Sequence, residues 1–536
     1  MHYENMQFEG FSWIGDHISR RAKLSPERLA VEDLDDKEQY TYSDLEHRAN
    51  RLANFLIDKL NLEKRERIAF LSRNRIEMFD AFFAAGKTGG IFVPYNIRLS
   101  VEELAELMQK EKPRILFYEK ALSDKVSRLK EKVEIEHCFV LDSRENQNKE
   151  TLEQASSTDR SYEEIETYDD TTLRQRDLHW EDIHLIMHTG GTTGLPKGAK
   201  ISHRAVLFNS LNELITWNID HTDSTHLLLP LFHTGGWHLL TLPLLQAGGR
   251  VFISRDFDPA LTLEVIEERE PTLIFGAATI FRVIARQPEF SGADLSSVRW
   301  MMSGAAPTPR EVMEKYWDKG VKFCAGYGLT EGGPNNLSII ADHMSLEEIK
   351  EKYDSVGVPF YFTEAKIVDE SGSEVEPGEE GELIFSGPQI FSGYWNNEEE
   401  TRRTLRDGWV YTGDMARRDE DGYYYIVGRK KNMFISGGEN VFPPEIERRL
   451  YEMPEVHEAC VIPVPDEKWG EVGKAVISLK ENSRLTKDEV ISYLEERLAG
   501  YKVPKYVTFV EELPKNDVGK IESSKVKEKF GKPNDS

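Results

Sequence analysis

A loop rich in glycine and threonine carries the strongest chemical signal in the sequence. Its residues are Thr189, Gly190, Gly191, Thr192, Thr193, Gly194, Leu195, Pro196, Lys197 and Gly198. Glycines let the backbone approach an anion closely, threonines donate hydrogen bonds, and lysine supplies a compact positive charge. The loop is not a Walker A motif, because Pro196 stands where a glycine should precede the lysine. The residue types therefore predict a polyphosphate cradle of a different kind.

The segments beside this loop argue against the alternative of a flexible linker. Such a composition is typical of linkers. Here, however, the apolar residues 183–187 predict a buried strand before the loop, and an apolar segment follows at residues 205–208. We therefore expect the loop to be held between two ordered elements.

Four further motifs follow the loop along the chain. They are AGYGLTE at residues 325–331, YTGD at 411–414, GRKK at 428–431 with SGGEN at 436–440, and PKNDVGKI at 514–521. Each motif alone would also fit a turn, a helix cap or a solvated tail. Together, in this order, they make the chain resemble the adenylate-forming superfamily, which comprises the acyl-CoA synthetases and their relatives.

The resemblance implies ATP, Mg²⁺ and coenzyme A as ligands. It assigns the loop from Thr189 to Lys197 to the β and γ phosphates, Thr330 to the α phosphate, and Glu331 with Thr189 to Mg²⁺. Asp414 would accept hydrogen bonds from the ribose, and Arg429 would reach ribose or phosphate. The adenine would be bordered by Gly304, Ala305, Ala306 and by Tyr327 with its neighbours Gly326 and Gly328.

The resemblance also implies a mobile C-terminal domain. Lys520 is the predicted catalytic residue, bridging the substrate carboxylate and the α phosphate during adenylation. Lys431 is the predicted hinge, and Gly437 and Gly438 would border the path of the pantetheine arm. Without the resemblance, Lys431 and Lys520 would be interpreted as solvated lysines.

Alternating strand and helix signals predict an α/β fold. Residues 67–71 and 91–94 are predicted strands, and residues 77–88 and 43–58 are predicted helices, the latter with Ser43 as N-cap. The expected architecture is a large N-terminal domain of two parallel-type sheets flanked by helices, with a small β-barrel-like subdomain and a small α+β C-terminal domain. We place the boundary between residues 1–430 and 431–536, after a hairpin whose turn is at residues 419–422. The charged residues 143–180 are predicted to be a surface excursion.

The acid-binding pocket is less clear from the sequence. His233 stands where amino-acid-activating relatives carry an aspartate, which disfavours an amino acid because its ammonium would be buried without a partner. Trp237 stands where long-chain fatty acyl-CoA synthetases place a gating tryptophan, although it would serve equally as a wall of the pocket. The small residues predicted to leave room for an acyl chain, or else to pack tightly, are Gly276, Ala277, Ala278, Gly332 and Gly333.

Composition limits the partners. A net charge of -26 over 536 residues disfavours nucleic acid and anionic membranes. The three cysteines, Cys138, Cys324 and Cys460, are far apart and predict neither a disulfide framework nor a zinc site. No signal peptide or apolar run of about eighteen residues is found, so we predict a cytoplasmic protein without an integral membrane segment. Peripheral membrane association and a homodimer are left open.

These observations predict an ATP-dependent acid:CoA ligase acting on a medium- or long-chain fatty acid. An aryl or other small-acid:CoA ligase is the nearest alternative, and an enzyme that loads a carrier protein is further off. A luciferase-like oxygenase would share all of the motifs. From a different class, a catalytically silent acyl-binding protein would bind its ligand but release no pyrophosphate.

Overall fold

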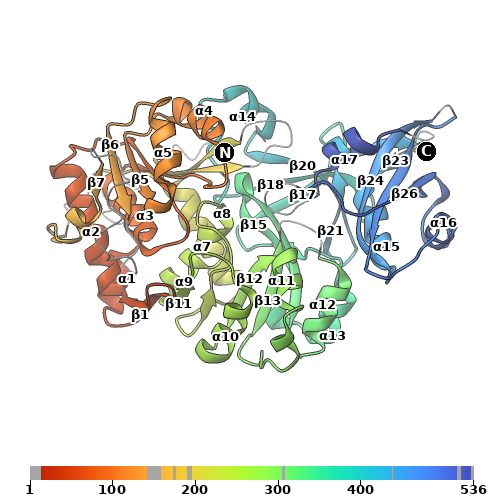
Figure 1. Cartoon of the computed structure of the whole chain (residues 1–536), viewed down its shortest axis with the longest axis horizontal. Helices are drawn as coiled ribbons and strands as arrows, with labels where there is room; N and C mark the ends of the chain where they lie inside the picture. The colour runs from red at the N-terminus through yellow and green to blue at the C-terminus, as the bar shows by residue number, and fades with distance from the viewer. Residues whose placement is uncertain are drawn as a thin grey trace.

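The computed structural model describes residues 14–141, 159–172, 177–189, 196–304, 308–436, 439–466, 468–515 and 521–532, without the side chains of residues 431, 439 and 440. Figure 1 shows a large N-terminal part and a smaller C-terminal part, which begins near the end of strand β21 (Tyr424–Arg429). The predicted fold, a large α/β domain followed by a small domain, is confirmed.

The first sheet has seven strands and carries the glycine-rich loop. Their order is β7-β6-β5-β3-β4-β8-β9, all parallel except β9, which pairs antiparallel with β8. The strands are β3 (Arg67–Leu71), β4 (Ile91–Pro94), β5 (Ile115–Glu119), β6 (His137–Leu141), β7 (Arg160–Ser161), β8 (Ile183–Thr189) and β9 (Lys197–Ser202). Both faces are buried, because Ile68 and Phe70 belong to one core cluster while Ala69 and Leu71 belong to another.

The helices around this sheet mostly follow the predicted pattern. They are α1 (Ser19–Leu24), α2 (Tyr42–Asp58), α3 (Ile76–Thr88), α4 (Val101–Glu111), α5 (Ser123–Lys130), α6 (Glu163–Glu166) and α7 (His203–Thr216). The N-cap prediction for α2 was wrong, because Thr41 rather than Ser43 caps the helix. The Thr41 side chain accepts from the N–H of Asp44, whose carboxylate accepts from the N–H of Thr41. Of the predicted surface excursion, residues 142–158 and 173–176 lie outside the described residues.

Two shorter sheets stand in place of the second parallel-type sheet. The order of one is β10-β11-β1-β2 and that of the other is β12-β13-β14-β15-β16. Their strands are β1 (Leu29–Asp33), β2 (Glu38–Thr41), β10 (Ser224–His226), β11 (Arg250–Ile253), β12 (Leu273–Ala277), β13 (Trp300–Gly304), β14 (Phe323–Leu329), β15 (Gly333–Ser338) and β16 (Val358–Pro359). A hydrogen bond from Thr272 N–H to Ser224 O (3.0 Å) joins the two sheets.

The helices of this region lie between and beside these strands. They are α8 (Thr234–His238), α9 (Thr241–Ala247), α10 (Pro259–Arg269), α11 (Ala278–Ile284), α12 (Arg310–Trp317) and α13 (Leu346–Glu351). Helices α8 and α9 lie against α7, so they fall between the first sheet and the second region. This position brings residues 231–245 into the core shared by both regions.

An antiparallel sheet completes the large domain. It consists of β17 (Glu364–Val368), β18 (Glu380–Ser386), β19 (Leu405–Arg406), β20 (Trp409–Arg418) and β21, and helix α14 (Glu398–Thr404) precedes β19. The predicted hairpin turn at residues 419–422 connects β20 and β21 and is confirmed. Because Asp414 pairs with Arg429 in this hairpin, the YTGD and GRKK motifs become neighbours.

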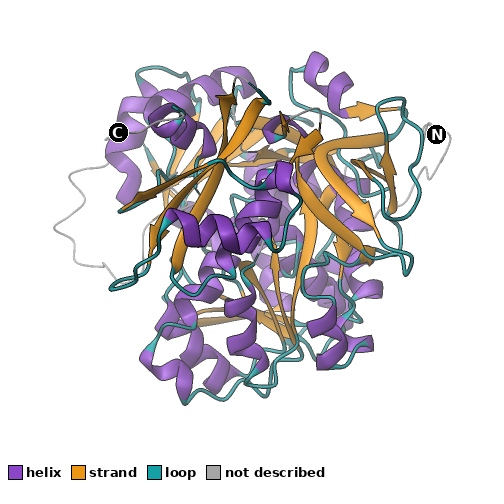
Figure 2. Cartoon of the chain, turned by 90° about the vertical axis from the view of Figure 1, so that its right-hand side faces the viewer, coloured by secondary structure: helices purple, strands orange, loops and turns teal. Residues whose placement is uncertain are grey.

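The C-terminal part has its own sheet and its own core. Its strands are β22 (Phe434–Ser436), β23 (Glu439–Val441), β24 (Val456–Asp466), β25 (Gly470–Leu479) and β26 (Tyr506–Val510), with helices α15 (Pro443–Tyr451), α16 (Lys487–Glu495) and α17 (Ser523–Phe530). Figure 2 views this part from the front. Its apolar cluster, which includes Ile446, Val461 and Ile477, is separate from the clusters of the large domain. The exact boundary at residue 430 stays a prediction.

All three cysteines lie in the core. Burial raises the pKa of the Cys138 thiol to about 11 and that of Cys324 to about 12, and it raises the pKa of Cys460 further. Among the helices in the described part of the chain, none is long and apolar enough to cross a membrane.

Candidate active site

Strands β8 and β9 with the loop between them are called the glycine-rich hairpin. A short segment, residues 391–395, connects this hairpin to the AGYGLTE motif. On one side, Trp395 N–H donates to Gly198 O (2.8 Å) and Lys200 N–H donates to Gly393 O (2.9 Å). On the other side, Phe391 N–H donates to Glu331 O (2.9 Å). This backbone connection holds two motifs together that are more than a hundred residues apart in the sequence.

Tyr394 from the same segment lies between Lys197 and Glu331. Its hydroxyl donates to Glu331 Oε1 (2.6 Å), and Lys197 Nζ lies 5.3 Å from the centre of its ring. Lys197 Nζ also forms an ion pair with Glu400 Oε1 (2.5 Å). Burial, together with the nearby Glu331 carboxylate, raises the pKa of Tyr394, so the phenol remains a donor. Tyr394 lies outside the five motifs and was not predicted from the sequence.

Glu331 fits the role of a magnesium ligand. Its Oε1 is held by Tyr394, whereas its Oε2 accepts no hydrogen bond from the described residues. A carboxylate oxygen in this state suits Mg²⁺, which prefers hard oxygen ligands and keeps several water molecules. Thr189 lies at the end of β8, where its hydroxyl is 3.5 Å from the backbone oxygen of Lys197. Thr189 thus lies near the backbone of Lys197, and Glu331 is linked to the Lys197 side chain through Tyr394.

Asp414 contacts two other residues that were predicted for the nucleotide site. Tyr327 donates to Asp414 Oδ2 (2.5 Å), and Arg429 Nε lies 2.6 Å from Asp414 Oδ1. Burial and the Asp414 charge raise the pKa of Tyr327 well above its usual value. An ionised carboxylate has about four lone-pair positions and acts only as an acceptor, which is the chemistry that ribose hydroxyls require.

The glycines near this carboxylate are required by close packing. A Cβ at Gly328 would lie 1.9 Å from Pro334 O, and one at Gly304 would lie 2.8 Å from the Phe275 ring. A Cβ at Gly326 would lie 3.0 Å from Met302 Sδ. Thr330 begins the turn that follows β14. The pairing of β13 with β14 places the end of β13 beside the strand that carries the AGYGLTE motif.

A buried carboxyl group, that of Glu111, packs against the glycine-rich hairpin. Tyr95 donates to Glu111 Oε2 (2.5 Å), and His188 Nε2 lies 2.8 Å from Glu111 Oε1. A Cβ at Gly198 would lie 2.8 Å from Glu111 Oε1, so glycine is needed at this position. The sequence analysis missed this group, because Glu111 ends an ordinary amphipathic helix.

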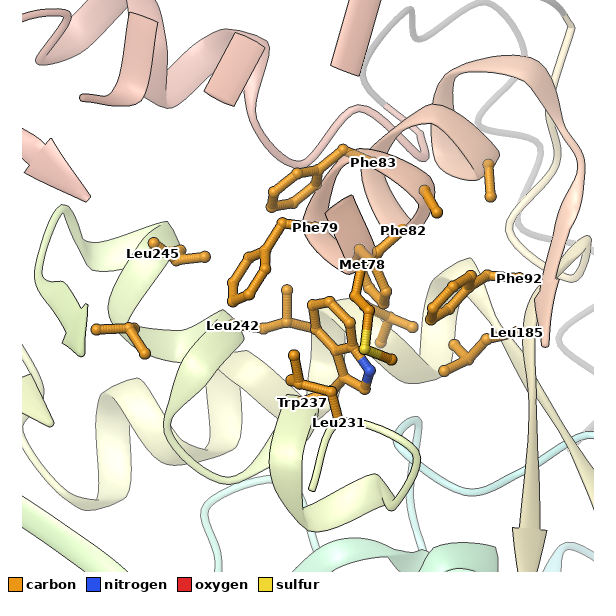
Figure 3. Packing of buried hydrophobic residues seen from close by; sticks show 14 of the residues in the cluster. Met78, Phe79, Phe82, Phe83, Phe92, Leu185, Leu231, Trp237, Leu242 and Leu245 are labelled. Carbon is orange, nitrogen blue, oxygen red and sulfur yellow. The ribbon is translucent and has the colours of Figure 1, made fainter. Parts of the chain in front are cut away.

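Trp237 lies in the hydrophobic core. Its ring is fully buried and stacks on Phe82, with 4.5 Å between the ring centroids and 18° between the planes. Phe79 and Phe92 contact it from two further sides. Figure 3 shows the indole enclosed by aromatic residues of α3 and β4 and by Leu231 and Leu242. These contacts hold the indole in a close-packed part of the core.

The glycines predicted for the acid pocket are tightly packed. A Cβ at Gly332 would lie 2.6 Å from Asn336 Oδ1, and one at Gly333, where φ is +82°, would lie 3.0 Å from Gln389. A Cβ at Gly276 would lie 3.3 Å from Phe281 and Ile280, and Ala277 ends the same strand. Of the two interpretations of these small residues, tight packing is the one that these distances favour.

A buried carboxyl group lies beside Gly332 and Gly333. Glu213 accepts from the side-chain amides of Asn335 (2.8 Å) and Asn209 (2.9 Å), and Asn209 also donates to His238 O (2.7 Å). Burial raises the pKa of Glu213 well above its usual value, which favours the protonated carboxyl group. We call Glu213, Asn209 and Asn335 the buried amide network. The polar residues after Gly333 were the only sequence signal for it.

His233 is half-buried, and its pKa is lowered. Burial lowers its pKa to about 4, and the positive charge of Arg98 contributes in the same direction. Its ring contacts Phe232 at the start of α8, with 4.8 Å between the centroids. A neutral imidazole provides no negative charge for a substrate ammonium.

The remaining predicted site residues lie outside the described part of the chain. They are Gly190, Gly191, Thr192, Thr193, Gly194, Ala305, Ala306, Gly437, Gly438 and Lys520. For Lys431 the backbone is described, in a short turn directly after β21. The functions predicted for these residues stay predictions.

Comparison with known proteins identifies the family. The model of the AMP-binding enzyme family matches residues 18–395, and the model of the AMP-binding enzyme C-terminal domain matches residues 445–520. The chain belongs to the AMP-binding enzymes. The first of these matches spans well over half of the sequence and includes the glycine-rich loop and the AGYGLTE motif.

Individual relatives of this AMP-binding enzyme agree with that assignment. The chain is 37% identical to a feruloyl-CoA synthase of Amycolatopsis sp, over 97% of this chain and 99% of the relative. It is 40% identical to a long-chain-fatty-acid–CoA ligase of Bacillus subtilis, over 63% of this chain and 60% of the relative. It also resembles the crystal structure of the anthranilate CoA ligase AuaEII with anthranoyl-AMP, with a TM-score of 0.86, 26% identity, and 99% of each chain covered.

These relatives define the reaction class. The protein is an AMP-forming acid–thiol ligase, which activates a carboxylic acid as its adenylate and then transfers the acyl group to coenzyme A. It uses ATP, Mg²⁺ and coenzyme A. The relatives act on different acids, so the acid itself does not follow from family membership.

Proposed function

We propose that this ligase activates an aromatic carboxylic acid. The observation that carries the proposal is the packing of Trp237, whose ring is fixed between Phe79, Phe82 and Phe92. A tryptophan that opens a tunnel must change rotamer, and this ring would have to leave a close-packed core to do so. A fixed wall and tightly packed glycines suit a flat acid of limited length.

The names of two relatives support the same proposal. A feruloyl-CoA synthase is the full-length relative reported above, and the similar solved structure is an anthranilate CoA ligase. A medium- or long-chain fatty acid is the second candidate. It is supported by the 40% identity to the long-chain-fatty-acid–CoA ligase of Bacillus subtilis.

We propose that the nucleotide is bound by groups that are paired with each other in the structure. Lys197, with the loop from Thr189, would bind the β and γ phosphates, exchanging its ion pair with Glu400 for phosphate oxygens. Thr330 would bind the α phosphate, and Glu331 with Thr189 would hold Mg²⁺. Asp414 would accept from the ribose hydroxyls, with Arg429 beside it.

The adenine and the reacting carboxylate complete the proposed nucleotide site. Gly304, Ala305 and Ala306 would border the adenine on one side, and Tyr327 between Gly326 and Gly328 would supply an aromatic face on the other. Lys520 would bridge the substrate carboxylate and the α phosphate, stabilising the charge that develops as pyrophosphate leaves.

We propose that the thioester step uses a rotated C-terminal domain with Lys431 as its hinge. Residue 431 lies in a turn between the sheet that ends with β21 and the sheet that begins with β22. A rotation at this point would remove Lys520 and admit the thiol along Gly437 and Gly438. The separate core of the C-terminal part is consistent with movement as a unit.

The decisive experiment is a panel of acids. Pyrophosphate release from ATP and Mg²⁺ is measured with hydroxycinnamic, aminobenzoic, medium-chain, long-chain and amino acids, each with and without coenzyme A. We expect the highest kcat/KM with an aromatic acid, and acyl-CoA only when coenzyme A is present. Preference for a long-chain acid would reject the aromatic proposal in favour of the second candidate.

Two variants test the assigned lysines in the same assay. Lys520→Ala is expected to slow pyrophosphate release by about 10²–10³-fold, the usual effect of removing one charge-stabilising donor. Thioester formation from supplied acyl-AMP should remain. Lys431→Pro is expected to slow the thioester step more than adenylation, and equal loss of both steps would reject the hinge assignment.

A further inference from the structure

Three histidines from distant parts of the sequence meet outside the predicted active site. His17 precedes α1, His184 lies in β8, and His203 is the first residue of α7. One ring nitrogen from each can be chosen so that all three lie within 4.8 Å of one another. The rings of His184 and His203 are 4.9 Å apart, and those of His17 and His184 are 5.5 Å apart.

Most of the ring nitrogens in this cluster have no hydrogen-bond partner. Both nitrogens of His184, both nitrogens of His203 and Nε2 of His17 are buried without a partner among the described residues. Buried polar atoms in folded proteins are nearly always satisfied, so a group of this kind calls for a bound ion or water. An imidazole donates and accepts in one plane, and stacking against a neighbouring ring does not replace those bonds.

The hydrogen-bond partner of a histidine decides which ring nitrogen can bind a metal. A neutral imidazole binds the ion through the nitrogen that does not carry the proton. The Gln246 side-chain nitrogen Nε2 lies 3.4 Å from His17 Nδ1 and can donate to it. A turn of the amide by 180° would instead place its oxygen there, which would accept the Nδ1 proton and leave the lone pair on His17 Nε2.

The backbone around the cluster is closely packed and contains two glycines. A Cβ at Gly15 would lie 2.4 Å from Gly86 O and 3.0 Å from His203, and a Cβ at Gly86 would lie 2.9 Å from His184. Only residues without a side chain let the segment that carries His17 approach α3 and the other two histidines. A pocket lined by Asp16, His17, His203 and Gln246, among others, connects the cluster to the surface.

The nearest charged groups are already paired. Asp16 lies 3.2 Å from Lys87 Nζ, and Asp182 lies 2.6 Å from Lys64 Nζ. The site therefore offers nitrogen ligands rather than carboxylate oxygens. That donor set is typical of zinc and other divalent transition metals and does not suit magnesium or calcium.

We propose that His17, His184 and His203 bind one divalent transition-metal ion of the zinc class. Three imidazole ligands leave a fourth tetrahedral position, which water from the pocket can fill. Zn–N bonds of about 2.0–2.1 Å place ligand nitrogens roughly 3.4 Å apart, so small rotations of the rings complete the site. The ion would connect the segment before α1 to β8, a strand of the glycine-rich hairpin, and to α7, the helix that follows this hairpin. This site is distinct from the magnesium bound with ATP.

The test measures metal binding directly. Untagged full-length protein is treated with a chelator, dialysed, and titrated with Zn²⁺ and separately with Co²⁺, whose visible absorption reports tetrahedral coordination. We expect one equivalent of tightly bound metal, intense Co²⁺ bands and a higher unfolding temperature with Zn²⁺. The variants are His17→Gln, which changes the least buried ligand, and His203→Gln.

A matched variant separates this site from other histidines. His226→Gln changes a buried histidine of β10, whose Nε2 lies near Ser254, and it is not part of the cluster. The proposal requires that this variant bind metal as the wild type does, while His17→Gln and His203→Gln lose at least tenfold in affinity and lose the Co²⁺ bands. Circular dichroism verifies that each variant is folded. Equal binding by the wild type and the cluster variants, or no binding by the wild type, would overturn the proposal.

Discussion

The nucleotide side and the acid side of the predicted active site differ in the kinds of side chain that form them. On the nucleotide side, charged groups pair across motifs, as in Lys197 with Glu400 and Arg429 with Asp414. On the acid side, Trp237 is fixed by aromatic packing, and the buried amide network of Glu213, Asn209 and Asn335 favours a protonated carboxyl group. Charged pairs can exchange partners when a ligand arrives, whereas close packing allows little movement.

This difference suggests how the two substrates are handled. The side chains proposed to bind ATP already form ion pairs with oppositely charged residues. They can exchange these partners for phosphates and ribose. The acid would bind to a close-packed surface that changes little in shape on binding. Selectivity for the acid would then come from fit to a wall, and removal of parts of that wall should change both stability and substrate range.

Trp237→Ala should give the largest effect. Removing a fully buried ring from the core should destabilise the protein by about 3–5 kcal/mol and allow longer acids to be activated. Denaturant unfolding and the acid panel measure the two effects. Trp217→Ala is the control, because Trp217 is also buried but contacts Trp300 and Phe360 elsewhere. Unchanged stability together with loss of long-chain activity would instead indicate a gate.

Asp414→Asn tests the nucleotide side, where charged side chains form ion pairs. The variant loses the charge that pairs with Arg429 and one acceptor for the ribose, so KM for ATP should rise on the order of 100-fold, as expected for charge-assisted hydrogen bonds of about 1.5–3 kcal/mol. Stability should change far less than in Trp237→Ala. Asp421→Asn, at an exposed position in the hairpin turn, is the control. A change in acid preference without a change in KM for ATP would contradict the assignment.

Glu213→Gln tests the buried amide network through pH. The pKa of Glu213 is raised in the folded protein above its usual value of 4.5. Above about pH 4.5 the folded state therefore binds more protons than the unfolded state, and wild-type stability falls as pH rises, by up to about 1.4 kcal/mol per unit. Glutamine has no proton to retain.

The difference between Glu213→Gln and the wild type should thus grow with pH in favour of the variant. Urea midpoints compared from about pH 5 to pH 7 measure this trend. Glutamine keeps the size of the side chain and one oxygen acceptor, while its Nε2 requires one of the two asparagine amides to turn and present its oxygen. Parallel pH curves for the two proteins would mean that Glu213 is ionised in the folded state.

Glu400→Gln should give the smallest effect. Lys197 must leave Glu400 to bind phosphate, and a partly exposed ion pair contributes only about 0.2–1 kcal/mol, so KM for ATP should fall by about twofold. Glu399→Gln, which changes an exposed partner of Arg403, is the matched control. A rise in KM would show that Glu400 positions the lysine for ATP.

The two sides also differ in how far the sequence predicts them. Lys197, Glu331 and Asp414 belong to short motifs whose spacing is visible in one chain, and the hairpin that pairs Asp414 with Arg429 was predicted from its turn. Tyr394, Glu111 and Glu213 were missed, because each acts through a contact with a residue far away in the sequence. The enclosure of Trp237 by α3 could not be predicted either, since periodicity shows which helix face is buried but not what covers it.

The buried cysteines have a consequence for an enzyme that makes reactive acyl groups. The acyl adenylate can acylate any accessible thiolate, and coenzyme A is the thiol meant to receive it. Cys138, Cys324 and Cys460 are the only cysteines of the chain, all are buried, and burial raises the pKa of each thiol. Its cysteines therefore do not compete with the co-substrate, and acylation of a cysteine or a mixed disulfide with coenzyme A would first require the core to open.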